Sequence, residues 1–128
     1  MPKNAWLAAA LVWTVAVVVL CLVSFNELPS IGGRQADKFA HFVFHFVFCA
    51  LWIGYAHIAF PRAKVLPMAV IVFVSASVFG IALEFAQEYF TQTRSADILD
   101  VAANATGALS GVWFGSQLIR GIQGRQKT

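Results

Sequence analysis

The sequence predicts an all-α integral membrane protein, a bundle of four transmembrane helices that run alternately up and down. Of its 128 residues 59% are hydrophobic and 12% are charged, and the mean hydropathy is +0.73. A soluble globule of this size needs more polar surface than that. The apolar residues also fall into four stretches, each near the roughly 20 residues that cross a bilayer core as a helix. Short connections separate them, so we expect a single transmembrane domain over residues 1–128.

The four helices are expected at the apolar stretches themselves, at approximately residues 5–25, 38–60, 65–89 and 98–119. The first stretch follows Lys3, as a secretory signal would, but no small-x-small cleavage pattern lies near its end. We therefore favour a helix of the mature protein over a signal sequence or signal anchor. Pro61 marks the turn between the second and third helices.

The basic residues predict how the bundle lies in the membrane. They gather at the N-terminus, between the second and third helices and at the C-terminus, namely at Lys3, Arg62, Lys64, Arg120, Arg125 and Lys127. By the positive-inside rule, both termini should face the cytoplasm. The opposite side carries three basic residues and all six acids, namely Arg34, Lys38, Arg94, Glu27, Asp37, Glu84, Glu88, Asp97 and Asp100. The basic rim suits anionic lipids, and no nucleic-acid motif is present, so membrane lipid is the expected partner.

Polar residues near the outward ends of three helices are spaced three or four apart, which places each set on one helical face. The sets are Asp37, His41 and His45, then Glu84, Gln87 and Glu88, and then Asp97, Asp100 and Asn104. An ion at the centre of a membrane helix costs about 2.5–3.5 kcal/mol, so these faces should turn toward one another and form a polar pocket open to the outside. Two cations are expected to pair within it: Arg94 with Glu84, Glu88 or Asp97, and Lys38 with Asp37 or Asp100.

The fourth helix carries a glycine at every fourth position, at Gly107, Gly111 and Gly115. Such small-xxx-small ridges let helix backbones approach closely. We favour packing against another helix of the same chain, and a homodimer through this ridge is the alternative. Cys21 and Cys49 show neither metal spacing nor a disulfide framework, and are expected to be small buried hydrophobic residues.

The order and spacing of these motifs resemble the VanZ-like family of small bacterial membrane proteins, over nearly the whole chain. The motifs are Asp37-Lys38-x-x-His41-Phe42, Glu84-x-x-Gln87, and Arg94 followed by Asp100-x-x-x-Asn104-x-x-Gly107. The resemblance implies a multi-pass protein of the bacterial inner membrane, in a family named for teicoplanin resistance. It supplies no settled mechanism. The family often has Tyr where this chain has His45, so the resemblance does not extend to this position.

The first function compatible with these residues is the binding or handling of a phosphate-bearing lipid or a lipid-linked envelope precursor. Lys38 and Arg94 would hold the phosphate, because Arg in particular suits phosphate geometry. The sugar or peptide part of the headgroup would be read by carboxylates and amides, with Asp37, Gln87 and Asn104 as the candidates.

Two alternatives stay open, so the sequence does not decide whether the protein is an enzyme. One is an intramembrane enzyme acting on the same headgroup, with Glu84 or Asp100 as general acid or base and His41 as proton carrier. No cofactor is required, but a divalent metal could bind to His41, His45, Glu84 and Asp100. The other alternative is a non-catalytic scaffold in which the polar residues form an internal lattice of salt bridges and hydrogen bonds.

Overall fold

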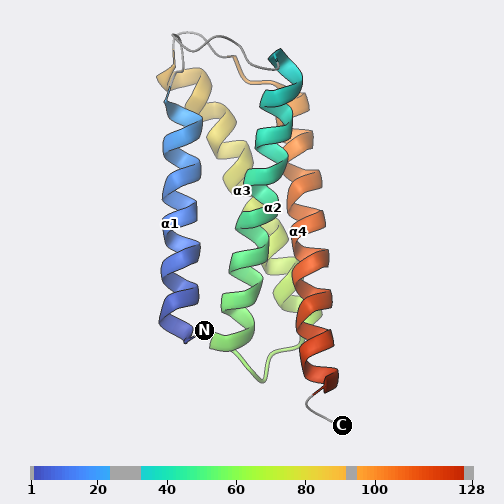
Figure 1. The fold of residues 1–128 in the computed structure, drawn as a ribbon. Coiled ribbons are helices and arrows are strands. Elements are labelled where there is room, and N and C mark those ends of the chain that lie inside the picture. The colour runs from blue at the N-terminus through green and yellow to red at the C-terminus, as the bar shows by residue number, and fades with distance from the viewer. Residues whose placement is uncertain (1, 24–32, 92–94, 126–128) are drawn as a thin grey trace.

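The structure, a computed structural model, describes residues 2–23, 33–91 and 95–125, except the side chains of Arg34 and of residues 122–125. Four helices occupy this part of the chain: α1 (Lys3–Leu22), α2 (Gly33–Ala59), α3 (Val65–Phe90) and α4 (Ile98–Arg125). They run alternately up and down, and both chain ends lie at the same end of the bundle as the α2–α3 connection (Figure 1). The prediction of an all-α, four-helix fold is confirmed, and no strand occurs in the described residues.

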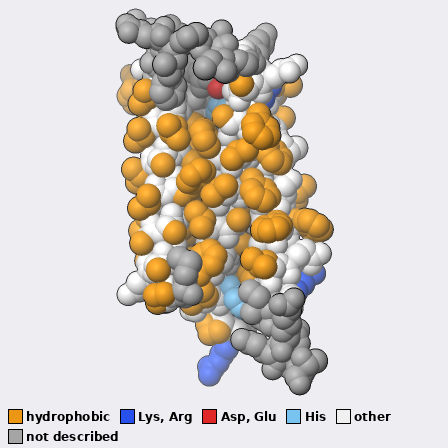
Figure 2. Space-filling model, in the orientation of Figure 1, with side chains coloured by type: hydrophobic (Ala, Val, Ile, Leu, Met, Phe, Trp, Pro, Cys, Tyr) orange, Lys and Arg blue, Asp and Glu red, His pale blue; other side chains and the backbone are white. Residues whose placement is uncertain are grey.

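Three of the helices are long and apolar enough to cross a membrane, over Lys3–Leu22, Gln35–Ala59 and Val65–Phe90. Apolar side chains cover most of the face in Figure 2, and the Lys and Arg side chains are at its two ends. These features suggest a membrane protein. The described part of α4 is not apolar enough to be counted with these three, because polar residues such as Asp100, Asn104 and Ser116 interrupt its apolar sequence.

Three helices differ from their predicted bounds. α2 begins at Gly33 rather than near residue 38, and α4 ends at Arg125 rather than near residue 119. α1 spans Lys3–Leu22 rather than residues 5–25, since the backbone of Val23 is already extended. The prediction marked apolar stretches, whereas backbone hydrogen bonding continues through the polar residues at either end of a membrane helix. Gly33 has a φ of 59°, a left-handed conformation that glycine adopts readily, and it stands at the start of α2.

The glycine ridge of α4 packs against α2 of the same chain. A β-carbon at Gly107 or Gly111 would fall on the carbonyl oxygens of Phe42 and Phe46, respectively, and one at Gly115 would meet the side chain of Ile53. α2 and α4 accordingly share the most extensive helix–helix contact of the bundle. The favoured intramolecular packing is therefore what the structure has, and a homodimer would need another surface.

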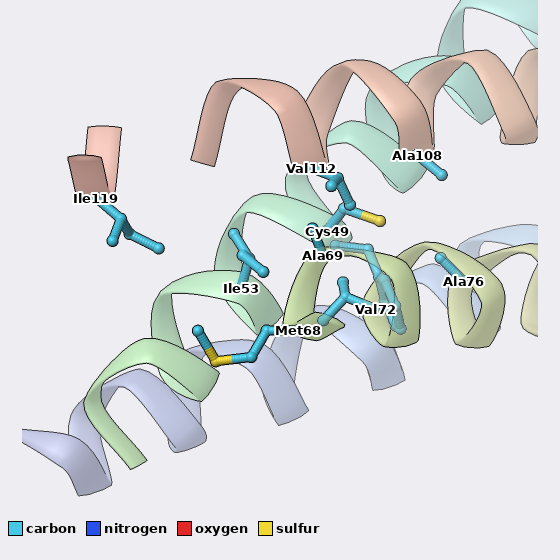
Figure 3. Close-up of a cluster of buried hydrophobic side chains, with 10 residues drawn as sticks. Cys49, Ile53, Met68, Ala69, Val72, Ala76, Ala108, Val112 and Ile119 are labelled. Carbon is cyan, nitrogen blue, oxygen red and sulfur yellow. The ribbon is translucent and has the colours of Figure 1, made fainter. Parts of the chain in front are cut away.

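An apolar core drawn from α2, α3 and α4 adjoins this contact (Figure 3). The core includes Cys49 and Ile53 of α2, Ala76 of α3 and Ala108 of α4, and all four are fully buried. The other cysteine, Cys21, is buried with Val17 and Leu83 in a second cluster between α1 and α3. Both cysteines are buried and neither is in a disulfide, as predicted.

Two hydrogen bonds donated by indole nitrogens connect α1 and α2. Nε1 of Trp13 donates to the carbonyl oxygen of Phe44 at 3.0 Å, and Nε1 of Trp52 donates to Oγ1 of Thr14 at 3.2 Å. Both bonds are partly buried, so each satisfies a donor that has few other partners within the bundle.

Replacing Trp13 with Phe should lower the free energy of unfolding by about 1 kcal/mol, because the ring is largely retained and the hydrogen bond to Phe44 is lost. Thermal unfolding in detergent measures this. Trp113→Phe is the matched control, since Trp113 is 64% exposed, and it should change stability much less. Equal effects of the two substitutions would show that the Trp13 hydrogen bond does not hold α1 in place.

Candidate functional site

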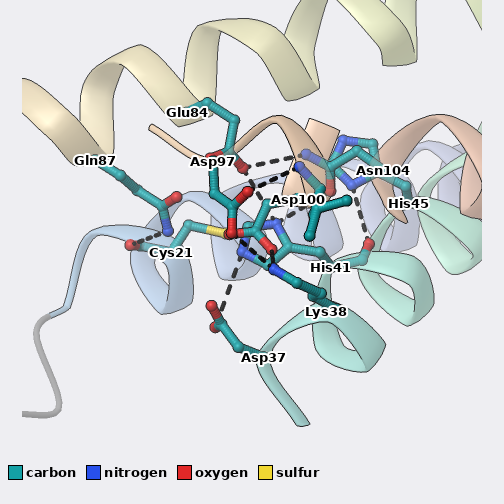
Figure 4. Close-up of polar contacts among 11 residues, drawn as sticks. Cys21, Asp37, Lys38, His41, His45, Glu84, Gln87, Asp97, Asp100 and Asn104 are labelled. Atoms are coloured by element: carbon teal, nitrogen blue, oxygen red, sulfur yellow. Dashed lines mark hydrogen bonds and ion pairs between the residues drawn. The ribbon is translucent and has the colours of Figure 1, made fainter. Parts of the chain in front are cut away.

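Polar side chains converge at the end of the bundle opposite the two termini, where α2 and α4 begin and α3 ends (Figure 4). We call this group the polar cluster and define it as Asp37, Lys38, His41, Glu84, Asp97, Asp100 and Asn104. His41, Glu84, Asp100 and Asn104 are buried, although each has a strongly polar side chain. Burial of such groups is unfavourable unless they are paired or hydrogen-bonded, so their contacts decide what the cluster can do.

Lys38 joins α2 to the start of α4. Its Nζ donates to Oδ2 of Asp97 at 2.8 Å and to Oδ1 of Asp100 at 2.9 Å. The predicted pairing of Lys38 with Asp100 is confirmed. An ammonium group has three donors, and these two bonds leave one of them for another acceptor.

His41, one turn further along α2, connects all three helices. Its Nδ1 lies 3.1 Å from Oδ1 of Asn104 and 3.5 Å from Oε1 of Glu84. Nδ2 of Asn104 in turn donates to Oε1 of Glu84 at 3.5 Å. Because an amide oxygen can only accept, Nδ1 of His41 carries a proton, and a neutral ring then has its lone pair on Nε2.

That second ring nitrogen points the other way, toward Asp37. Nε2 of His41 lies 4.0 Å from Oδ1 of Asp37, one turn earlier on α2. This distance is beyond hydrogen-bond range. The contact is thus a charge interaction only when the ring is protonated.

Gln87 lies beside the polar cluster but bonds elsewhere. Its Nε2 donates to the carbonyl oxygen of Cys21 at 2.8 Å, which ties the end of α1 to α3. Glu88, predicted on the same face, is exposed, so that prediction is wrong. The buried face of α3 runs instead through Gly80, Glu84, Gln87 and Thr91.

His45 does not join the other proposed metal ligands. Its Nδ1 faces the carbonyl oxygen of His41 at 3.3 Å, and its Nε2 is buried without a hydrogen bond. A β-carbon at Gly80 would lie 2.8 Å from that Nε2 and 3.1 Å from the Asn104 side chain. Glycine at position 80 therefore allows His45 and Asn104 to approach α3.

The three predicted polar faces thus do meet, through residues of α2, α3 and α4. Arg94 lies outside the described residues, and so do its predicted pairings. Two features of the site were not predicted from the sequence. Lys38 was expected to pair with Asp37 or Asp100, and it also pairs with Asp97. Gly80 was not singled out, because an isolated glycine in an apolar helix gives no signal.

Comparisons with protein-family models, with curated proteins and with solved structures find no match to this chain. The VanZ-like resemblance therefore stays a prediction, and the chemistry of the polar cluster rests on its own geometry. That geometry offers carboxylates, one ammonium group and an imidazole whose tautomer is fixed by a neighbouring amide. Such groups can bind a charged headgroup, transfer a proton or hold a metal ion.

Proposed function

We propose that the chain is a VanZ-like protein of the bacterial cytoplasmic membrane, with four spans and both termini in the cytoplasm. Support comes from the common placement of the two chain ends with the α2–α3 connection, where Arg62 and Lys64 lie. The positive-inside rule assigns such an end to the cytoplasm. α4 would cross the membrane with its polar residues turned toward α2 and α3, and the polar cluster would face outward.

We further propose that the polar cluster binds the headgroup of a phosphate-bearing lipid or lipid-linked envelope precursor. The observation that carries this is the convergence of ionisable side chains from three helices at one end of an otherwise apolar bundle. The third N–H of Lys38, together with Arg94, would donate hydrogen bonds to phosphate oxygens. Carboxylate and amide groups would accept or donate hydrogen bonds to the sugar or peptide part.

This function also accounts for the antibiotic connection that the VanZ-like resemblance implies. Teicoplanin carries a lipid tail and acts at the outer face of the membrane. A protein that alters outer-leaflet lipids or lipid-linked precursors would change what the antibiotic meets there. We propose resistance only as a consequence of lipid handling.

A second candidate is an enzyme acting on the same headgroup, and one contact favours it. Glu84 and His41 are both buried and lie 3.5 Å apart, while His41 directs its other nitrogen away from Glu84. A carboxylate behind a histidine orients the ring and stabilises its protonated form, an arrangement suited to proton transfer. His41 would then transfer the proton, and Glu84 would hold the His41 ring in position.

The test is thermal unfolding of the purified full chain with added lipids, a polyprenyl phosphate and a diacylglycerol of similar chain length. A ligand at about 100 times its Kd stabilises the folded state by about 2.7 kcal/mol, so the phosphate lipid should raise the Tm of the wild type and the diacylglycerol should not. Arg94→Ala should lose this response, because it removes a guanidinium group that would bind the phosphate. Glu88→Gln, an exposed carboxylate on the same end, should retain it.

A scaffold would behave differently. If the polar cluster is only a structural lattice, Asp100→Asn and Glu84→Gln should both lower the Tm strongly, and no lipid should shift the Tm of any variant. That result would contradict the proposed function.

A further inference from the structure

We infer that Asp37, His41 and Asp100 form a binding site for a divalent transition-metal ion of the zinc class. Each residue offers one ligand atom, and these atoms all lie within 4.8 Å of one another. Two of them come from α2, one turn apart, and the third comes from the first turn of α4. Asp100 is buried, whereas Asp37 is only partly buried, so the site lies at the outer margin of the polar cluster.

The first argument is the state of the His41 ring. Its Nδ1 donates to the oxygen of Asn104, which leaves the lone pair of a neutral ring on Nε2. Among the described residues Nε2 makes no hydrogen bond, although the His41 side chain is only 2% exposed. Metal-binding histidines characteristically donate their other ring nitrogen to an oxygen acceptor that fixes the tautomer, and Asn104, with Glu84 behind it, occupies that position.

The second argument is distance. Zinc binds imidazole nitrogen and carboxylate oxygen at about 2.1 Å, so two ligands of one ion lie about 3–4 Å apart. Nε2 of His41 and Oδ1 of Asp37 are 4.0 Å apart, too far for a hydrogen bond and close to what a shared ion requires. The Asp100 ligand atom lies within 4.8 Å of the other two, so it must move closer to them to bind the same ion.

The third argument is charge. Among the described residues the polar cluster has four carboxylates, at Asp37, Glu84, Asp97 and Asp100, and one ammonium group, at Lys38. Carboxylates outnumber cations even if the charges of Arg34 and Arg94 are added. Lys38 already holds one oxygen of Asp100, at 2.9 Å, and would oppose a second cation there. The excess of carboxylates still favours binding of a divalent cation, and the charge of Lys38 should lower the affinity of the site for that cation.

The ligand set expected from the sequence, His41, His45, Glu84 and Asp100, changes accordingly. His45 aims its Nδ1 at a backbone carbonyl and its Nε2 toward Gly80. Glu84 lies on the Nδ1 side of His41, where it supports the ring instead of sharing its ion. Asp37 takes their place.

The inference deepens the proposed function, on which it rests for its role: an ion held by three protein ligands keeps an open position for a phosphate oxygen of the headgroup. Metal binding itself needs no lipid, so the two proposals can fail separately.

The test is titration of the purified, chelator-treated full chain with Co²⁺, followed by displacement with Zn²⁺, in detergent without added lipid. The visible absorption of Co²⁺ reports nitrogen and oxygen ligation, and calorimetry gives the Kd for Zn²⁺. We expect one ion per chain. Asp37→Asn and His41→Gln should each weaken binding at least about 100-fold, because changes outside the ligand shell alone cost about 10- to 100-fold. Circular dichroism and the Tm establish that each variant is folded.

Two further variants sharpen the result. Glu88→Gln removes an exposed carboxylate from the same end and should leave the Kd unchanged. Lys38→Met should tighten Zn²⁺ binding, because the ammonium competes at Asp100. The inference is overturned if the wild type binds neither ion stoichiometrically, if folded Asp37→Asn binds as tightly as the wild type, or if His45→Gln weakens binding as much as His41→Gln. A Tm shift with polyprenyl phosphate that persists in chelator would leave the lipid proposal standing without the metal.

Discussion

Gly107→Ala should lower the free energy of unfolding by about 3 kcal/mol, at the upper end of what overpacking a well-packed contact costs. The added methyl group would fall on the carbonyl oxygen of Phe42, and its nearest neighbours are backbone atoms of α2. Backbone cannot turn away as a side chain can, so α2 and α4 must separate. These two helices form the most extensive contact of the bundle and carry most of the polar cluster.

Gly121→Ala is the matched control for this substitution. It lies on the same helix, but a β-carbon there meets nothing within 4 Å. Alanine is the better helix former, by about 0.8–1.0 kcal/mol, so this variant should be as stable as the wild type or more so. Thermal unfolding in detergent compares the two. If Gly107→Ala melts like Gly121→Ala, the close approach of α2 and α4 is not as described.

Asn104→Leu should destabilise the bundle by about 3 kcal/mol or more, because it leaves two buried polar partners without their hydrogen bonds at a cost of about 1–3 kcal/mol each. The partners are Nδ1 of His41 and Oε1 of Glu84. Asn104 is also packed beside Gly80, so a branched side chain has little room.

Thr106→Ala, two residues further along α4, is the comparison for Asn104. Thr106 is exposed, and its hydroxyl donates only to carbonyl oxygens of its own helix. Its loss should change stability by no more than about 0.5 kcal/mol. Similar melting of Asn104→Leu and Thr106→Ala would show that the Asn104 amide does not hold His41 and Glu84 together.

The helices could be predicted from the sequence because each long apolar stretch must be removed from water, into lipid or into the core, and a helix satisfies its backbone hydrogen bonds there. The convergence of the polar faces was predictable for the same reason, since lipid cannot satisfy groups such as Glu84 and Asn104. Packing of the Gly107 ridge within the same chain was favoured but left open, because the spacing of glycines does not show which helix packs against them. In the structure that helix is α2.

The individual pairings could not be predicted, because they depend on how the helices are rotated and how far each extends. Lys38 reaches Asp97 only because the start of α4 lies against the second turn of α2. The exposure of Glu88 follows from the rotation of α3, which buries Glu84 and Gln87 and turns the next residue outward. Helical spacing alone placed all three together.

Gentle extraction of the full chain from its own membrane, followed by native mass spectrometry, tests most directly whether the polar cluster is a headgroup site. The wild type should retain one class of phosphate-bearing lipid. Arg94→Ala should lose it while the protein stays folded, and Glu88→Gln should keep it. Retention of the same mixture of lipids by all three proteins would contradict a headgroup site and indicate that the buried charges serve the structure alone.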